Sequence, residues 1–222
     1  MTDNFAIIKD FIQSQWGGDF DSFKDAFYMI DIIGRRKDGA NIEAHKFKTY
    51  FIKEIGDLDK YENEIKTLCD ALQMRAYISV NSKSWRKVTL NTMACYAERI
   101  SHDLFDKPQS VFDSCAAKFV DKSSQLWIID VDKEDAELFG LTLDEVVALF
   151  AETIETKVKP NKKIVTVIPT KSGKHIICHP FDCYDFIEII DDKMTKSAAK
   201  FEFTSEDLIK KNNPTLLYEN VK

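Results

Sequence analysis

The 222-residue sequence lacks the marks of a membrane or exported protein. No stretch approaches the roughly 18 consecutive apolar residues that would cross a bilayer. The opening residues, MTDNFAIIKDF, include acidic side chains and no long apolar core, so we expect no signal peptide. The five cysteines are odd in number and mostly far apart, which argues against a disulfide framework. We therefore predict a cytoplasmic location and no contact with a membrane.

A surplus of positive charge is also missing. The chain has 31 basic and 37 acidic residues and a net charge of -6, whereas a protein that binds a polyanion usually has the opposite balance. This composition excludes a wholly electrostatic nucleic-acid binder but leaves room for a local basic face. With 44% hydrophobic residues and 16 phenylalanines, the chain can bury the core of one domain, or of one domain with an appendage.

No internal repeat or low-complexity segment interrupts the chain. Apolar periodicity predicts helices over residues 4–15, 57–74, 86–105, 110–119, 142–157 and 205–210. Strand-like runs occupy residues 26–33, 42–52, 75–81, 125–132, 164–168, 174–178 and 215–218. The first two runs flank the charged segment 34–41 and predict a β-hairpin with a basic loop.

Because strands and helices mix without strict alternation, we predict an α+β fold in which helices cover a mixed or antiparallel sheet. Residues 1–56 would form an N-terminal helix plus β-hairpin packed on a core of residues 57–222.

Two acidic residues end one of the predicted strands. Residues 125–132, QLWIIDVD, place Asp130 and Asp132 after an apolar run. Residues two apart on a strand point to the same side, so both carboxylates would leave the sheet together, as oxygen ligands of Mg²⁺ do. The alternative is a strand that ends in acids because solvent begins there, with Asp132 starting a turn. Because residues 127–129 are apolar on both faces, we predict a central strand, at whose end an α/β site normally lies.

A turn with phosphate-binding chemistry follows later in the chain. Residues 169–182, PTKSGKHIICHPFD, place Ser172 and Gly173 before Lys174, His175 and an apolar strand. Glycine lets a backbone approach a phosphate closely, and serine, lysine and histidine supply donors to its oxygens. Many tight Ser-Gly hairpins have a neighbouring lysine for solubility alone, and that alternative stays open.

Basic residues are separated from acids in two segments. Residues 75–97 contain four basic residues and residues 157–181 contain six lysines, and neither segment has an acid. In an acidic protein such separation indicates a phosphate-binding face. A solvated lysine face is the alternative.

Two other patterns carry less chemistry. Four potential zinc ligands, His175, Cys178, His179 and Cys183, fall within nine residues, but on a strand Cys178 points away from the two histidines. We therefore do not expect a zinc site. The segment Lys37-Asp38-Gly39 lacks the residue between lysine and aspartate that the lysine motif of nucleotidyl-transferring ligases requires.

The strand RAYISVN, a helical insert, the strand ending in IDVD and SGKH running into a strand together resemble the catalytic core of archaeo-eukaryotic primases and primase-polymerases. The first motif of that family is two acids one residue apart, matched by Asp130 and Asp132. The second is a small residue, one or two residues and then histidine, matched by Ser172 and His175. The resemblance covers residues 75–218, about two-thirds of the chain.

The resemblance implies a modified RNA-recognition-like catalytic core in which Asp130 and Asp132 hold Mg²⁺ or Mn²⁺ and act with His175 in catalysis. It also implies a site for the triphosphate of a nucleotide, formed by Ser172, Gly173, Lys174 and His175. Together with the basic segments, it predicts these contacts to a nucleic acid: Arg35, Arg36, Arg75, Lys83, Arg86, Lys87 and Lys171.

A third family motif, a further acid on a later strand, has no clear match. Asp191, Asp192 and Glu219 are candidates, and Asn212 stands where an acid is expected. The zinc module of the family is absent from the sequence.

We expect a template-dependent nucleotidyltransferase, a small primase or primase-polymerase that uses nucleoside triphosphates on single-stranded DNA or RNA, with a replication protein as partner. One alternative is a catalytically inactive primase-fold module of a mobile element that binds nucleic acid or protein. Another is a different metal-dependent phosphotransfer enzyme, such as a nuclease.

Overall fold

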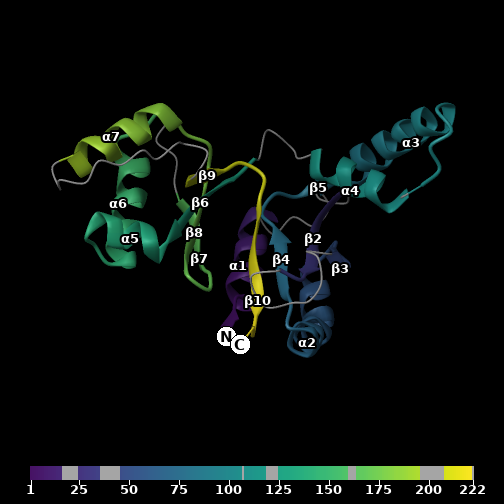
Figure 1. Ribbon diagram of the computed structural model, residues 1–222, viewed down its shortest axis with the longest axis horizontal. Helices are drawn as coiled ribbons and strands as arrows, with labels where there is room; N and C mark the ends of the chain where they lie inside the picture. Colours follow the sequence, from purple (N-terminus) through teal and green to yellow (C-terminus); the bar gives the residue numbers. More distant parts are fainter. Residues whose placement is uncertain are drawn as a thin grey trace.

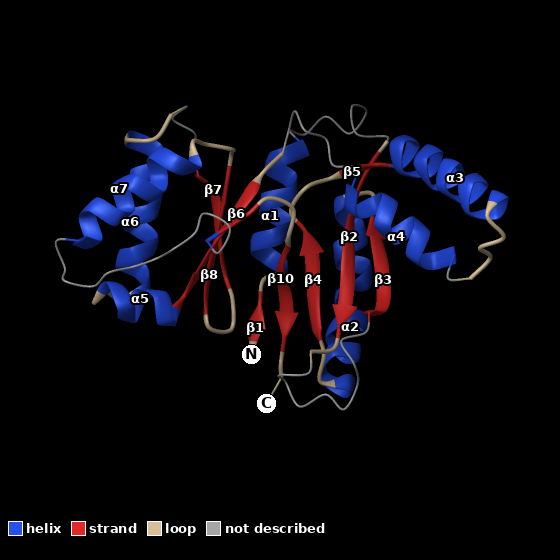
Figure 2. Cartoon of the chain, turned by 45° about the horizontal axis from the view of Figure 1, so that its top comes forward, coloured by secondary structure: helices blue, strands red, loops and turns tan. Residues whose placement is uncertain are grey.

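The computed structural model describes residues 1–16, 25–35, 46–106, 108–118, 125–159, 164–195 and 208–221. Its helices are α1 (Phe5–Trp16), α2 (Ile55–Leu72), α3 (Trp85–Ser101), α4 (Pro108–Lys118), α5 (Lys133–Phe139), α6 (Leu143–Thr156) and α7 (Cys183–Thr195). Its strands are β1 (Thr2–Asp3), β2 (Ala26–Ile33), β3 (Lys46–Ile52), β4 (Arg75–Ser79), β5 (Lys83–Ser84), β6 (Trp127–Asp132), β7 (Ile164–Pro169), β8 (Gly173–Cys178), β9 (Ile209–Lys210) and β10 (Pro214–Glu219). Helices and antiparallel sheets together confirm the predicted α+β class (Figures 1 and 2).

The first sheet has the order β1-β10-β4-β2-β3, with β5 added to β2. Alternation along β2 gives the sheet two different faces. Ile30 and Ile32 are buried in a core with α1 and α2, while Phe27 and Met29 point the other way into a small core with α3 and α4. The helices α3 and α4 therefore cover only one end of the second face, and polar residues occupy the remainder of it.

The second sheet has the order β7-β8-β6-β9, and the chain runs through it as β-α-β-β-α-β. On one face Ile129 and Val131 pack with Phe150 of α6 under the helices α6 and α7. On the other face Ile128 and Ile177 join the core that contains α1. Strand β6 lies between β8 and β9, as predicted for a central strand. In Figure 1 the layer of α5, α6 and α7 lies at the opposite end of the molecule from α3.

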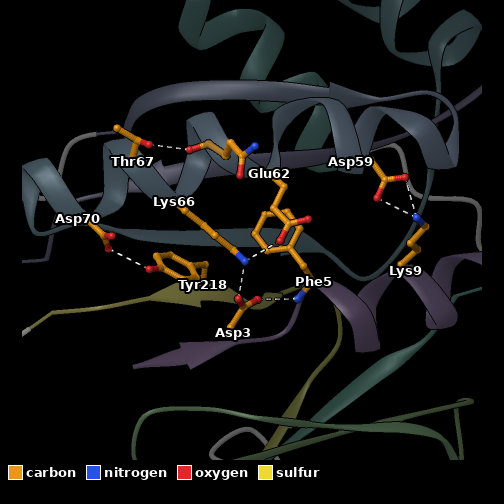
Figure 3. Close-up of polar contacts among 10 residues, drawn as sticks. Asp3, Phe5, Lys9, Asp59, Glu62, Lys66, Thr67, Asp70 and Tyr218 are labelled. Atoms are coloured by element: carbon orange, nitrogen blue, oxygen red, sulfur yellow. Dashed lines mark hydrogen bonds and ion pairs between the residues drawn. The ribbon is translucent and has the colours of Figure 1, made fainter.

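Polar contacts tie helix α2 to both ends of the chain (Figure 3). Lys66 pairs with Asp3 of β1 and with Glu62, both at 2.5 Å between Nζ and a carboxylate oxygen. The Tyr218 hydroxyl on β10 donates to Asp70 Oδ1 at 2.9 Å. Since β1 pairs with β10, these contacts fix the edge of the first sheet against α2.

The structure corrects part of the expected secondary structure. Of the helix expected over residues 205–210, residues 205–207 lie outside the described residues and Leu208 is helical, but Ile209–Lys210 is strand β9, paired with β6. The short elements β1, β5 and α5 were not expected. Residues 36–45, which include Arg36 and most of the predicted basic loop, lie outside the described residues.

The hairpin strand β2 pairs with β4, so residues on both sides of the expected boundary at 56 share one sheet, and the division into 1–56 and 57–222 stays a prediction.

No helix in the described ranges is long and apolar enough to cross a bilayer.

Candidate functional site

The pairing of β6 with β8 brings the predicted acids and histidine together. Asp130 lies directly opposite His175 and Asp132 lies opposite Gly173. Nε2 of His175 is 3.2 Å from Oδ1 of Asp130, and the Ser172 hydroxyl donates to Oδ1 of Asp132 at 2.9 Å. The residues that matched two separate motifs in the sequence therefore contact each other in two neighbouring pairs.

Strand β10 of the first sheet completes the surroundings of His175. Nδ1 of the ring is 2.8 Å from Oγ1 of Thr215, which is buried. The threonine hydroxyl can accept from this nitrogen or donate to it, according to which ring nitrogen bears the proton. The histidine is thus held between a carboxylate on its own sheet and a hydroxyl on the other.

A cavity of about 360 Å³ opens between the two sheets at this point. Acidic side chains from β6 and the basic side chains Arg35, Arg75 and Lys171 all line it, so it suits a metal and a phosphate at once. Its lining comprises Arg35, Arg75, Tyr77, Asp130, Asp132, Thr170, Lys171, Ser172, His175 and Leu216.

The charges around Asp130 keep it ionised. Burial acts to raise the pKa of this carboxyl, but the hydrogen bond with His175 and the positive charges of His175, Lys210 and Arg35 together hold the pKa below its usual value. An ionised carboxylate is the form that binds a divalent cation.

Helix α5 begins directly after Asp132 and brings a further acid near the pair. The backbone N–H of Asp132 donates to Oδ2 of Asp135 at 2.8 Å, and the N–H of Lys133 donates to the Ser172 carbonyl at 2.9 Å. Burial, aided by the negative charges of Asp132 and Asp130, raises the pKa of Asp135 against the lowering effect of the hydrogen bond from the Asp132 N–H. Asp135 is thus a third carboxylate that interacts with the pair through charge, and it was not among the expected candidates.

The expected candidates for a third metal ligand lie elsewhere. Asp191 and Asp192 belong to α7, on the helix-covered side of the second sheet. Glu219 pairs with Arg75, and Asn212 donates to the Ala117 carbonyl at 2.6 Å. Within the described residues no three His, Cys, Asp or Glu side chains are placed to share a metal.

The strand that flanks β6 on its other side is β9, where Lys210 pairs with Ile128. A cation, rather than a third acid, therefore contributes to the charge around Asp130 from that strand.

Several predicted site residues are not in this cavity. Lys174 points to the helix side and forms an ion pair with Asp144 at the start of α6. Lys83 is buried in a second cavity, and Arg86 and Lys87 are exposed in the first turn of α3. The expected divergence of the cysteine-histidine set is visible at Cys178, whose thiol is buried beside the Trp127 carbonyl.

Tyr77, Thr170, Thr215 and Leu216 were missed from the sequence. Tyr77 could have been predicted from the sequence, because it stands two residues after Arg75 on the same strand and therefore lies on the same face of the sheet. Thr215 and Leu216 carry no local signal, since only the pairing of the distant strand β10 brings them to the site.

Gly173 is required for the close approach of β8 to β6. A Cβ added there would lie 2.0 Å from the Val131 carbonyl oxygen and 2.8 Å from Cα of Asp132. The glycine thus has a packing role, in addition to the phosphate contact expected from the sequence.

We expect Gly173→Ala to destabilise the fold by about 2–3 kcal/mol, because overpacking against backbone cannot be relieved by a side-chain rotation. Urea unfolding followed by circular dichroism measures the loss. Gly56→Ala is the matched control, since a Cβ at that helical position meets nothing within 4 Å. Equal midpoints for the two variants would contradict the packing role.

Comparisons with known proteins assign no family to this chain. No protein-family model and no curated protein matches the sequence, and no solved structure matches the fold. Its function therefore has to be inferred from the geometry of the site.

Proposed function

We propose that the protein is a metal-dependent nucleotidyltransferase of the primase or primase-polymerase type, which joins nucleoside triphosphates on a single-stranded template. One observation carries the proposal: Asp130 and Asp132 share a cavity with Ser172 and His175 on one wall and with Arg35 and Arg75 on the other. Carboxylates for a cation and arginines for phosphates are the two requirements of phosphoryl transfer.

The acid pair fits Mg²⁺ or Mn²⁺. Asp130 faces His175 through Oδ1, and the Asp132 side chain accepts from the Ser172 hydroxyl and from the Asp135 N–H. Each carboxylate has about four lone-pair sites, so both keep acceptor capacity for a cation. Protein-bound Mg²⁺ commonly takes one or two carboxylates and completes its shell with waters and substrate phosphates. Bound there, the metal would lower the pKa of a 3′-hydroxyl and stabilise charge on the leaving pyrophosphate.

The residues of the chain would then position the triphosphate. Ser172 and Lys171 on the β7–β8 turn, with Arg75 opposite them, supply donors to phosphate oxygens. His175 is held by Asp130 and Thr215 so that its ring cannot rotate freely. Lys174 forms an ion pair with Asp144 outside the cavity, so we do not assign it a contact to the triphosphate.

The nucleic acid would approach from the side of α3, where Arg86 and Lys87 are exposed. A DNA strand is the proposed template, RNA is an alternative, and a replication protein would be the partner. All five cysteines are free thiols, which agrees with our proposal of a cytoplasmic location.

The alternative function is a protein that has this fold but does not catalyse a reaction. The charge of Lys210 beside Asp130, together with the lack of a third ligand among the described residues, favours a module that binds nucleic acid or protein. A nuclease would share the acids but would not need a triphosphate.

Thermal unfolding with a nucleoside triphosphate, Mn²⁺, or both separates these readings. We expect the pair together to stabilise the protein by about 2.7 kcal/mol at a hundredfold excess over the dissociation constant, and by clearly more than either alone. Stabilisation by Mn²⁺ that the triphosphate does not increase would indicate a nuclease. No stabilisation, with strand binding indifferent to EDTA, would indicate the binding module.

A further inference from the structure

A second cavity, of about 170 Å³, lies on the same face of the first sheet as the proposed site. Residues of β4 that point to this face line both cavities: Arg75 and Tyr77 line the proposed site, and Ser79 lines the second cavity. On β10, Leu216 lines the proposed site and Pro214 lines the second cavity. The cavities are therefore neighbours on adjoining strands, since two residues of a strand span about 7 Å. The full lining of the second cavity is Met29, Asp31, Lys46, Ser79, Lys83, Asp113, Ala117, Asn212 and Pro214.

Lys83 is the unusual residue of this second cavity. The residue is only 6% exposed, and within the described part of the chain its ammonium group has no ion pair or hydrogen bond. Burial lowers its pKa to about 8, with Asp31 acting to raise it and Lys46 to lower it further. A lysine that is largely buried and has no partner among the described residues is costly to a fold, and an anion that entered the cavity would supply that partner.

The acids of the cavity are already bound to other groups. Lys46 lies between Asp31 and Asp113, at 3.3 Å and 3.2 Å from their oxygens, and the Thr49 hydroxyl donates to Asp31 at 2.6 Å. Ser79 accepts from the Met29 N–H and still has a hydroxyl proton to donate. Lys83 and Ser79 thus have donors that no described group uses. Asp31 and Asp113 are already bound to Lys46 and do not neutralise Lys83 by a direct contact.

We propose that Lys83 and Ser79 bind a backbone phosphate of the single strand that enters the neighbouring site. The inference rests on the proposed function for the identity of the strand, and it adds a position at which the strand is held. The path would run across the open face of β4, from Ser79 past Tyr77 to the acid pair. Arg35 donates to the Tyr77 hydroxyl at 3.1 Å, which would leave the face of this ring for a base.

Strand binding by Lys83→Met tests the proposal, because methionine keeps the bulk of lysine and removes its charge. We expect about tenfold weaker binding of a single-stranded oligodeoxynucleotide at low salt. The slope of log affinity against log salt should fall by about 0.7, as expected for one lost phosphate contact. Stabilisation by triphosphate with Mn²⁺ should not change. Lys60→Met is the control, since it removes the same charge from an exposed position on α2, at the other face of the sheet.

Equal affinity and slope in Lys83→Met and Lys60→Met would overturn the proposal. A wild-type protein that binds the strand through Lys83 but ignores the triphosphate would support this subsite and reject the nucleotidyltransferase. If Lys83→Met does not fold, labelling of wild-type Lys83 by an amine-reactive ester at pH 8, read by mass spectrometry, gives the answer. Protection by the oligonucleotide supports the subsite, and protection by inorganic phosphate but not by the oligonucleotide rejects it.

Discussion

Asp130→Asn is expected to reduce nucleotidyl transfer by about 10³-fold, because the loss of a metal-binding charge removes several kcal/mol of transition-state stabilisation. Asparagine has nearly the same shape as aspartate and can still accept a hydrogen bond from His175, so the arrangement of β6 and β8 should persist. Primer extension, or initiation on single-stranded DNA with Mn²⁺, measures the effect. Asp144→Asn, which breaks only the ion pair with Lys174 outside the cavity, should leave activity unchanged.

The same substitution has a pH signature in stability. The pKa of Asp130 in the folded protein lies below its unfolded value, so the carboxylate stabilises the fold above the unfolded pKa, and this stabilisation is lost as the pH falls through the folded pKa. Asp130→Asn should therefore be less stable than the wild type at pH 7, and the difference should shrink in acid. Unchanged activity in this variant would reject the catalytic proposal, even if the stability difference is found.

The core of the candidate site could be predicted because its signals are local. The period-two spacing of Asp130 and Asp132 placed both on one face, and the Ser172-Gly173 turn predicted a strand that begins just before His175. Hydrophobic residues on both sides of β6 predicted a central position, which the flanking strands β8 and β9 confirm. These features depend on few residues each and not on contacts between distant parts of the chain.

The same period-two rule could have shown that Lys174 faces away from the site, although the SGKH motif led us to place it there. If His175 faces the acids, the preceding residue must face the helices, where Asp144 binds it. Asp135 was readable as well, since it stands three residues after Asp132, the spacing of a capping box at a helix start. In both cases residue spacing on the element was more informative than residue type.

Other parts of the site required the tertiary structure. Strand β9 has two residues, too few to show any periodicity, and only its pairing with β6 defines it. Arg75 lies on an interior strand of the first sheet and Arg35 just after another, and they meet the acids only because the two sheets line one cavity. Thr215 lies 40 residues along the chain from His175, on a strand of the other sheet. No pattern within a single segment encodes such distances.

The ion pair of Arg75 and Glu219 gives the largest expected effect on stability. Nε and Oε2 lie 3.1 Å apart, and the two side chains are only 7% and 4% exposed. Glu219→Ala leaves the guanidinium buried without its carboxylate, which should cost about 3–5 kcal/mol in the free energy of unfolding. Urea unfolding measures the loss, and Thr2→Val is the control, since it removes only the long 3.3 Å contact of the Thr2 hydroxyl to Glu219.

A double variant distinguishes the charge from the packing. Arg75→Met with Glu219→Leu removes both charges while it keeps apolar bulk, so most of the lost stability should return. Arg75 also lines the proposed site. In the double variant we therefore expect stability to be restored and triphosphate binding to be weakened. A double variant as unstable as Glu219→Ala would show that the pair acts through shape and not through charge. A stable double variant with full triphosphate binding would show that Arg75 belongs to the fold and not to the site.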